Sequence, residues 1–247
     1  MLGLPPSIRA ALFDLDGVLT QTAREHAAAW QQMFDDYLSK RAQRTGEPFV
    51  PFDAKQDYDD YIDGKLRADG TRSFLESRGI HLPEGTPDDP ADAETINGLS
   101  NRKNEILLER LRNNGIQVYP GSVKYLHAVK DAGLHRAVVS ASANTRQALD
   151  AAHLTDQFEA IVDGIVAGRE HLKGKPAPDS YLAAARLLHV QPFEAVVFED
   201  ALAGVAAGRA GGFGFVVGVD RVGQRKALQE HGADIVVDDL SELLDRK

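Results

Sequence analysis

The chain has 247 residues, which suffices for one or two domains with a substantial hydrophobic core. Its formal net charge of −9 argues against the basic surface that nucleic-acid-binding proteins use. The lack of cysteine excludes a disulfide framework, a thiolate nucleophile and a zinc–thiolate site. The sequence has neither a signal-peptide pattern nor the roughly 18 consecutive apolar residues of a membrane span, so we expect a cytoplasmic protein without membrane contacts.

The first predicted strand covers Ala10–Phe13 and ends in two carboxylates. Asp14 and Asp16 are two residues apart, and Gly17 permits a sharp turn directly after them. Two anions next to a buried strand repel each other, and a cation between them removes that cost. We therefore expect a hard-cation site at the carboxyl end of this strand. Alternatively, Asp-Leu-Asp-Gly is only a polar turn that closes the strand.

Residues 21–118 contain helical patterns and no strong strand, which predicts a helical module inserted after the first strand. Apolar residues at helical spacing indicate one helix around residues 27–37 and another over Ile96–Arg112. Thr22 and His26 lie four residues apart near the start of the first helix, so they can share a face that looks back at the carboxylates. The alternative for His26 is an ordinary surface or packing histidine.

The inserted module carries two basic stretches. Residues 46–70 are rich in Gly, Pro, Asp and Tyr, and here Gly64 precedes Lys65 and Arg67 in a predicted loop that could present cations to an anionic ligand. The stretch Arg102-Lys103-Asn104 adds a basic step within the later helix. For both stretches the alternative is ordinary charged side chains on a solvated turn or helix face.

From residue 119 onward, strand and helix patterns alternate, which predicts buried parallel strands with helical connections. Further strands are predicted at Ala137–Val139, Ala160–Val162, Ala195–Phe198, Phe215–Val219 and Ile235–Val237. The predicted fold class is therefore α/β, with a Rossmann-like parallel-sheet core and an inserted α-helical cap domain. We assign residues 1–20 and 119–247 to the core and residues 21–118 to the cap.

Polar residues follow three of the later core segments. Ser140-Ala141-Ser142-Ala143-Asn144 separates a strand from a helix, where hydroxyls and free N–H groups form an anion site or simply cap the helix. Gly174-Lys175-Pro176 places a lysine on a stiff loop, where it holds a phosphate, balances carboxylates or is a plain surface residue. Glu199-Asp200 ends another strand. Together with Asp14 and Asp16, this pair supplies enough carboxylates for Mg²⁺.

The order of these residues resembles the haloacid dehalogenase-like phosphotransferase superfamily over nearly the whole chain, and within it the β-phosphoglucomutase-like subfamily. The resemblance is carried by Asp14-Leu15-Asp16-Gly17-Val18-Leu19-Thr20 with Thr22 and His26, Arg102-Lys103-Asn104, Ser140-Ala141-Ser142 with Asn144, Lys175-Pro176-Ala177-Pro178-Asp179, and Glu199-Asp200. It implies a Mg²⁺-dependent mutase that interconverts β-glucose 1-phosphate and glucose 6-phosphate through a bisphosphate. Two alternatives remain: a phosphatase acting on a small sugar phosphate, and a catalytically idle binding protein.

The resemblance also implies roles for the residues at the strand ends. Asp14 would attack phosphorus and form an aspartyl phosphate, and Asp16 would act as general acid and base. Mg²⁺ would be held by the Asp14 carboxylate, the Asp16 backbone carbonyl and the pair Glu199 and Asp200. Lys175, together with Ser140, would hold the transferring phosphoryl group.

The remaining implied roles concern substrate binding and closure of the cap. Ser142 and Asn144, with Ala141 between the two serines, would bind the distal phosphate of the sugar. Gly64 and Arg67 match the cap loop that contacts substrate. Residues that would couple cap closure to the acid/base group are Thr22, His26 and Lys103.

Three residues depart from the subfamily pattern. Gln21 replaces an acidic residue that relays to His26, and Ala143 replaces a basic residue at the distal phosphate. Asp63 replaces a lysine in the cap loop, although Lys65 is nearby. The cap loop around residues 83–94 is also longer. These departures bear on the substrate rather than on phosphoryl transfer. No long heptad pattern suggests assembly, and we expect a monomer.

Overall fold

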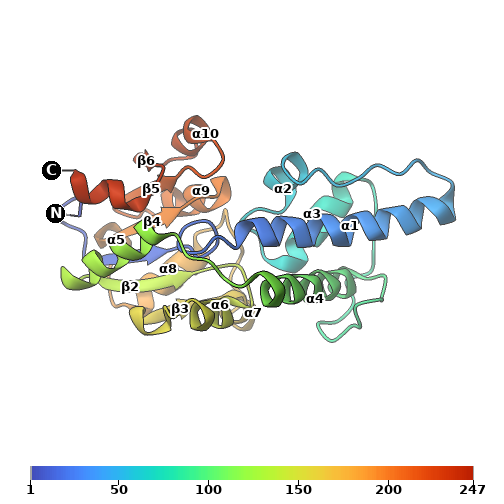
Figure 1. The fold of residues 1–247 in the computed structure, drawn as a ribbon, viewed down its shortest axis with the longest axis horizontal. Helices are drawn as coiled ribbons and strands as arrows, with labels where there is room; N and C mark the ends of the chain where they lie inside the picture. The colour runs from blue at the N-terminus through green and yellow to red at the C-terminus, as the bar shows by residue number, and fades with distance from the viewer. Residues whose placement is uncertain (1, 247) are drawn as a thin grey trace. The chain divides into compact units, whose positions relative to one another are not determined.

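The computed structural model describes residues 2–246 and forms two compact units (Figure 1). The first unit comprises the chain up to Gln21, the short segment Gly64–Leu66, and the chain from Ile116 onward. The second comprises Thr22–Asp63 and Arg67–Gly115. Each unit is described below by itself.

The first unit is built on a six-stranded sheet in the order β3-β2-β1-β4-β5-β6, in which all neighbouring strands are parallel (Figure 1). The strands are β1 (Ala10–Phe13), β2 (His135–Val139), β3 (Ala160–Val162), β4 (Ala195–Glu199), β5 (Phe215–Val219) and β6 (Ile235–Val237). Only β2 and β4 differ from the predicted bounds: β2 begins two residues earlier and β4 includes Glu199. The predicted Rossmann-like core is confirmed, and the central strand β1 lies between β2 and β4.

Helices connect the strands of this unit. They are α5 (Pro120–Asp131), α6 (Thr145–Ala151), α7 (Gly164–Arg169), α8 (Asp179–Leu187), α9 (Leu202–Ala210) and α10 (Arg225–Glu230), with 3₁₀ turns η1 (Thr155–Gln157), η2 (Pro192–Glu194) and η3 (Leu240–Asp245). The sequence pattern did not predict α7, a short helix with two glycines. Its start is stabilised locally, because the Asp163 side chain accepts a hydrogen bond of 2.8 Å from Val166 N.

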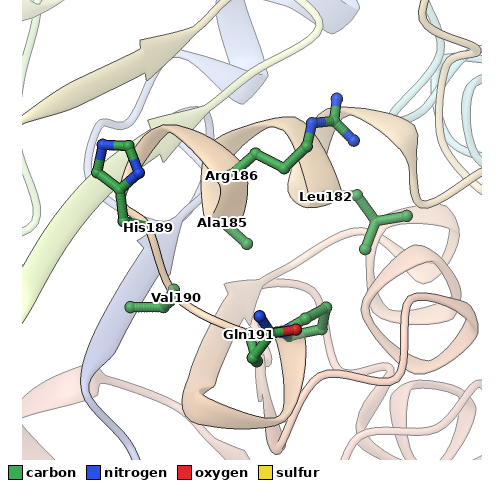
Figure 2. Close-up of a pocket in the computed structure, with 7 residues that line it drawn as sticks. Leu182, Ala185, Arg186, His189, Val190 and Gln191 are labelled. Atoms are coloured by element: carbon green, nitrogen blue, oxygen red, sulfur yellow. The ribbon is translucent and has the colours of Figure 1, made fainter.

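A cavity of about 400 Å³ lies at the carboxyl end of α8 (Figure 2). Its lining comprises Leu182, Ala185, Arg186, His189, Val190, Gln191 and Pro192. None of the predicted site residues belongs to this lining, so this cavity is separate from the strand ends that carry Asp14, Ser140 and Glu199.

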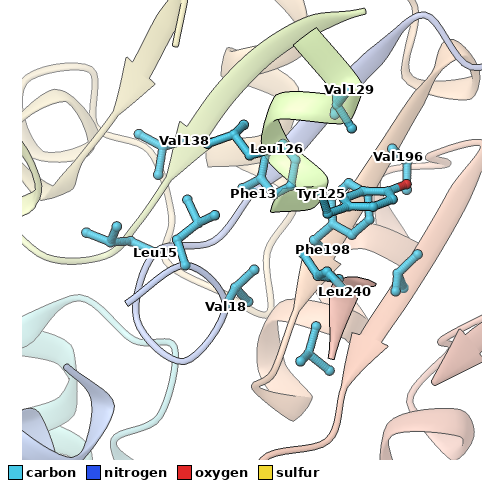
Figure 3. Close-up of a cluster of buried hydrophobic side chains, with 14 of the residues drawn as sticks. Phe13, Leu15, Val18, Tyr125, Leu126, Val129, Val138, Val196, Phe198 and Leu240 are labelled. Atoms are coloured by element: carbon cyan, nitrogen blue, oxygen red, sulfur yellow. The ribbon is translucent and has the colours of Figure 1, made fainter. Parts of the chain in front are cut away.

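Both faces of the sheet are covered, which explains why its strands are mostly apolar rather than alternating, apart from His135 and Arg136 at the start of β2 and Glu199 at the end of β4. On one face, Phe13 stacks on Phe198 with ring centroids 4.6 Å apart, and Tyr125 of α5 packs edge-on against Phe198 (Figure 3). Leu15 and Val18, from the turn after β1, are buried in the same cluster (Figure 3). The turn that carries Asp14 and Asp16 is thus anchored in the core by its own apolar side chains.

The second unit consists of helices with a hydrophobic core of their own. Its helices are α1 (Ala23–Thr45), α2 (Gln56–Tyr61), α3 (Arg67–Ser77) and α4 (Ile96–Asn114). The aromatic rings of Phe34, Phe52 and Phe74 form the centre of this core, with the Phe34 and Phe74 centroids 4.2 Å apart. No helix within residues 2–246 has the length and apolar character needed to cross a bilayer.

The loop expected to carry Gly64, Lys65 and Arg67 is partly wrong. Residues 56–61 form α2, and Arg67 begins α3, so Arg67 lies on a helix rather than in a loop. Glycine and aspartate made this stretch look irregular, but Phe74 and Leu75, on the same helix as Arg67, are fully buried. Burial in the helical core outweighs the weak helix propensity of its first turn.

Candidate active site

The turn after β1 is held by a compact set of backbone hydrogen bonds. Asp14 N donates to Phe198 O of the neighbouring strand, at 3.0 Å, and Leu15 O accepts from both Leu19 N and Thr20 N at 2.9 Å. Gly17 has a φ of 86°, which favours glycine. A Cβ at Gly17 would also lie 1.8 Å from Asp200 Oδ2. Glycine is therefore required here for both backbone conformation and space.

Lys175 joins the two acidic strand ends. Its Nζ lies 2.6 Å from Asp14 Oδ1 and 2.5 Å from Glu199 Oε1, and all three side chains are buried. Burial raises the pKa of Asp14 well above its usual value; Lys175 opposes this shift, whereas Glu199 and Asp16 reinforce it. Burial would lower the pKa of Lys175, but the two carboxylates outweigh it and raise that pKa. The alternative of a plain surface lysine is therefore wrong.

Tyr181 of α8 contacts both Glu199 and Lys175. Its hydroxyl donates a hydrogen bond of 2.8 Å to Glu199 Oε1, and its ring centroid lies 5.1 Å from Lys175 Nζ. Ala201 N donates to the other Glu199 oxygen at 3.1 Å. Burial and the charge of Glu199 raise the pKa of Tyr181. Sequence reasoning missed Tyr181 because it reads as one more apolar position of an amphipathic helix.

Three carboxylates lie close enough to share a metal ion. One oxygen each from Asp14, Glu199 and Asp200 falls within 4.8 Å of the others. Carboxylate oxygens are the donors that hard divalent cations prefer, and a cation would relieve the repulsion that contributes to the raised pKa of Asp14. The donor set therefore fits a hard metal ion. The side chain of Asp16 lies toward β2 instead, where its Oδ2 accepts a hydrogen bond from Ser140 Oγ at 3.4 Å.

The segment after β2 is a turn held by the hydroxyls of two serines. Ser140 is buried, and its Oγ accepts from Ser142 N at 3.1 Å. Ser142 Oγ accepts from Asn144 N at 3.2 Å, and α6 begins directly afterwards. Ala141 lies close to Gly164: a Cβ built on Gly164 would be 2.6 Å from Ala141 O. The two serines thus stabilise the turn while Ser140 also contacts Asp16.

Gly64 belongs to the same compact unit as Lys175. A Cβ built on Gly64 would lie 3.2 Å from Ala203 Cβ and 3.6 Å from Lys175 Cβ. Its φ of 72° also favours glycine. Of the two residues assigned to the cap loop, Gly64 is therefore the one that the structure brings next to Lys175.

The other predicted cap residues belong to the helical unit. His26 Nδ1 lies 3.2 Å from Lys103 Nζ, and Lys103 is buried against the Trp30 ring. Because an ammonium group only donates, His26 Nδ1 is the acceptor in a hydrogen bond from Lys103. Thr22 precedes α1, and its carbonyl accepts from His26 N at 3.0 Å. Burial lowers the pKa of Arg67.

The chain is similar to known proteins over most of its length. A profile of haloacid dehalogenase-like hydrolases matches residues 8–212. The chain is 59% identical to the beta-phosphoglucomutase of Mycobacterium bovis over 247 residues, or 99% of this chain and 94% of that protein. It is 31% identical to the beta-phosphoglucomutase of Bacillus subtilis, covering 96% of this chain and 92% of that one.

A solved structure extends the similarity to the fold. The beta-phosphoglucomutase of Clostridium difficile matches with a TM-score of 0.74 and 28% identity, covering 96% of this chain and 93% of that one. The match is similar in extent to the sequence matches and spans both compact units. On the basis of the profile and of these relatives, the chain belongs to the haloacid dehalogenase-like hydrolase family of enzymes.

Proposed function

We propose that this enzyme interconverts β-D-glucose 1-phosphate and D-glucose 6-phosphate. The observation that carries the proposal is the 59% identity, over 99% of the chain, to a protein named beta-phosphoglucomutase. The buried cluster of Asp14, Lys175 and Glu199 supports it, because a nucleophilic carboxylate paired with a fixed cation is what phosphoryl transfer needs.

Asp14 is the nucleophile of the proposed reaction. The phosphorylated Asp14 donates its phosphoryl group to the free hydroxyl of a sugar monophosphate, which yields a bisphosphate and the free carboxylate. Asp14 then attacks the other phosphorus of the reoriented bisphosphate, and the sugar oxygen leaves as the isomeric monophosphate. Lys175 favours the ionised form of Asp14 against the effect of burial and holds an oxygen of the phosphoryl group.

Asp16 handles the proton in each half of the reaction. It accepts the proton of the attacking sugar hydroxyl and returns it to the leaving oxygen when the second half runs. The hydrogen bond from Ser140 Oγ orients the Asp16 carboxylate. Ser140 also lies at the end of β2, next to β1, where a second donor can reach the phosphoryl group.

Mg²⁺ is the metal that we propose for the carboxylate cluster. Asp14, Glu199 and Asp200 would hold it with the Asp16 backbone carbonyl, since Mg²⁺ takes few carboxylates and leaves room for water and phosphate oxygens. When bound, the metal neutralises negative charge on the transferring phosphoryl group.

The distal phosphate of the substrate is assigned to a second group of residues. Ser142, Asn144 and the backbone at Ala141 would bind it in the segment after β2, where Ala143 supplies no cation. Arg67 would contribute a guanidinium whose pKa burial lowers, so an incoming phosphate would stabilise its charged form. Gly64 would let the substrate loop approach Lys175.

We propose that residues 21–118 act as a cap on a catalytic core made of residues 1–20 and 119–247. Thr22, His26 and Lys103 would couple closure of this cap to Asp16. Closure would exclude water, which favours transfer to the sugar over hydrolysis. We further infer a monomer that acts in the cytoplasm on a small phosphosugar.

A product assay tests the proposal. The enzyme is supplied with β-glucose 1-phosphate, Mg²⁺ and a trace of glucose 1,6-bisphosphate, and glucose 6-phosphate and free phosphate are followed together. We expect glucose 6-phosphate without stoichiometric phosphate, and no product with Asp14→Asn. Free phosphate as the main product would make the enzyme a sugar phosphatase and overturn the mutase proposal.

A further inference from the structure

Arg221, which the reaction described above does not use, lies in the loop between β5 and α10 and reaches the turn that carries Asp16. Its Nε donates a hydrogen bond of 2.7 Å to Gly17 O, and its Nη2 lies 3.4 Å from Val18 O. These carbonyls follow Asp16 directly in the chain. One guanidinium therefore contacts two successive peptide groups of the catalytic turn.

The guanidinium is itself held in a fixed plane. Nη1 donates to Asp238 O at 2.8 Å, and Nη2 lies 3.4 Å from Ser122 Oγ. The guanidinium carbon lies 3.5 Å from the centroid of the Tyr119 ring, a stacked cation–π arrangement. The side chain is 14% exposed. With this many partners, Arg221 has little freedom to change its orientation.

The same turn is bounded by other fixed points. Tyr119 N donates to Leu19 O at 2.9 Å, so the residue on which Arg221 stacks also pairs with the end of the turn. Gly17 also lies against the Asp200 carboxylate. A shift of the Gly17 peptide would therefore move the turn after Asp16 relative to a proposed metal ligand.

We propose that Arg221 is a positioning residue that sets the placement of Asp16 through the Gly17 and Val18 carbonyls. The inference rests on the proposed role of Asp16 in phosphoryl transfer. A guanidinium is suited to this task because its planar, divergent donors span two carbonyls at once, whereas the single ammonium of a lysine does not. Misplacement of a catalytic group by about 1 Å lowers turnover by up to about a hundredfold.

The test compares Arg221→Ala and Arg221→Lys with Arg225→Ala. Arg225 is the matched control, because it also binds the end of β6, at Val236 O and Asp238, but does not contact the turn. Turnover of p-nitrophenyl phosphate is measured with Mg²⁺, alongside the thermal midpoint of unfolding. This substrate tests phosphoryl transfer without sugar specificity.

We expect kcat to fall about tenfold or more in Arg221→Ala, less in Arg221→Lys, and to stay within about twofold of native in Arg225→Ala. Added guanidinium ion, far below denaturing concentrations, should restore part of the Arg221→Ala rate while lowering its thermal midpoint. If Arg221 only stabilised the fold, guanidinium would lower the thermal midpoint of Arg221→Ala without raising its rate.

The proposal is overturned if both Arg221 variants keep native kcat, or if guanidinium fails to restore Arg221→Ala and Arg225→Ala loses as much turnover. Should Arg221→Ala not fold, a folded Arg221→Lys with native kcat overturns it as well. A native enzyme that hydrolyses the aryl phosphate but does not interconvert glucose phosphates would instead refute the proposed sugar reaction and leave the result for Arg221 intact.

Discussion

The Tyr181 hydroxyl donates a hydrogen bond of 2.8 Å to the Glu199 carboxylate, and both side chains are fully buried. Within residues 2–246, Glu199 receives donors from Lys175, Tyr181 and Ala201 N. A carboxylate with this many donors is held in one rotamer. Tyr181 thereby links the packing of α8 to the acidic cluster at the strand ends.

Replacing Tyr181 with Phe tests this link, because the ring beneath Lys175 stays and only the donor is lost. We expect the apparent affinity for Mg²⁺ to weaken about tenfold, the usual effect of removing a partner that orients a metal ligand. The affinity is measured by calorimetric titration of Mg²⁺ in the absence of substrate. Tyr125→Phe is the control. Tyr125 lies on α5, and its hydroxyl also donates a hydrogen bond of 2.8 Å, but to Leu2 O rather than to a carboxylate of the cluster. Equal Mg²⁺ affinities in the two variants would contradict the assignment.

Lys175→Met should remove both activity and much of the stability. It leaves Asp14 and Glu199 as buried carboxylates without their cation, a loss of about 3–5 kcal/mol in the free energy of unfolding. We expect kcat to fall about a hundredfold to a thousandfold, as for the loss of one donor to a reacting oxyanion. Urea denaturation and the product assay measure the two effects. Lys173→Met, at an exposed position two residues earlier, should change neither, and a similar loss there would refute the interpretation.

Asp220 gives a pH-dependent contribution to stability. Burial would raise its pKa, but hydrogen bonds from the backbone N–H groups of Gln224 and Gly223, and then of Val222 and Arg225, outweigh burial and lower it below 3.8. Because the folded pKa is the lower one, this contribution is complete above the unfolded pKa and disappears as the pH falls through the folded pKa.

The variant Asp220→Asn should therefore unfold about 1 kcal/mol more easily than the native protein at neutral pH, because a neutral amide oxygen accepts hydrogen bonds more weakly than a carboxylate does. Urea titrations at neutral pH and at a pH below 3.8 measure the difference in the free energy of unfolding between the native protein and Asp220→Asn. We expect the gap between the two proteins to narrow in acid. A gap that is independent of pH would show that the charge of Asp220 is not responsible.

The strand ends were predictable from the sequence because apolar runs and the polar residues after them are local features. Asp14, Ser140 and Glu199 follow or end β1, β2 and β4, and these strands are neighbours in the sheet. Sequence patterns do not encode that neighbour relation directly; the family resemblance supplied it. Lys175 could be located in the sequence, but its burial between two carboxylates depends on tertiary packing.

The contributions of Tyr181 and Arg221 could not be predicted for the same reason. A tyrosine on a buried helix face and an arginine in a loop have no pattern that reveals their partners, which are 18 and 204 residues away in sequence. The helical start at Arg67 was missed because local composition favoured a loop, whereas the buried Phe74 and Leu75 decide the outcome.

Three histidines adopt left-handed backbone conformations, and this gives a prediction about stability alone. His153, His171 and His189 have φ values of 56°, 53° and 55°, and each follows the end of a helix, where glycine is the favoured residue. Replacing each in turn with glycine should stabilise the fold by up to about 1 kcal/mol, since relief of the strain outweighs the added entropy of the unfolded chain.

Gly133→Ala is the converse control. Gly133 has a φ of 78°, and no described residue lies within 4 Å of the place that a Cβ would take. This variant should therefore lose a similar amount of stability through backbone strain alone. Urea denaturation of the four variants measures the expected gain in the free energy of unfolding for the histidine variants and the expected loss for Gly133→Ala. A destabilised His189→Gly would show that the contacts of the histidine side chain stabilise the fold by more than the backbone strain destabilises it.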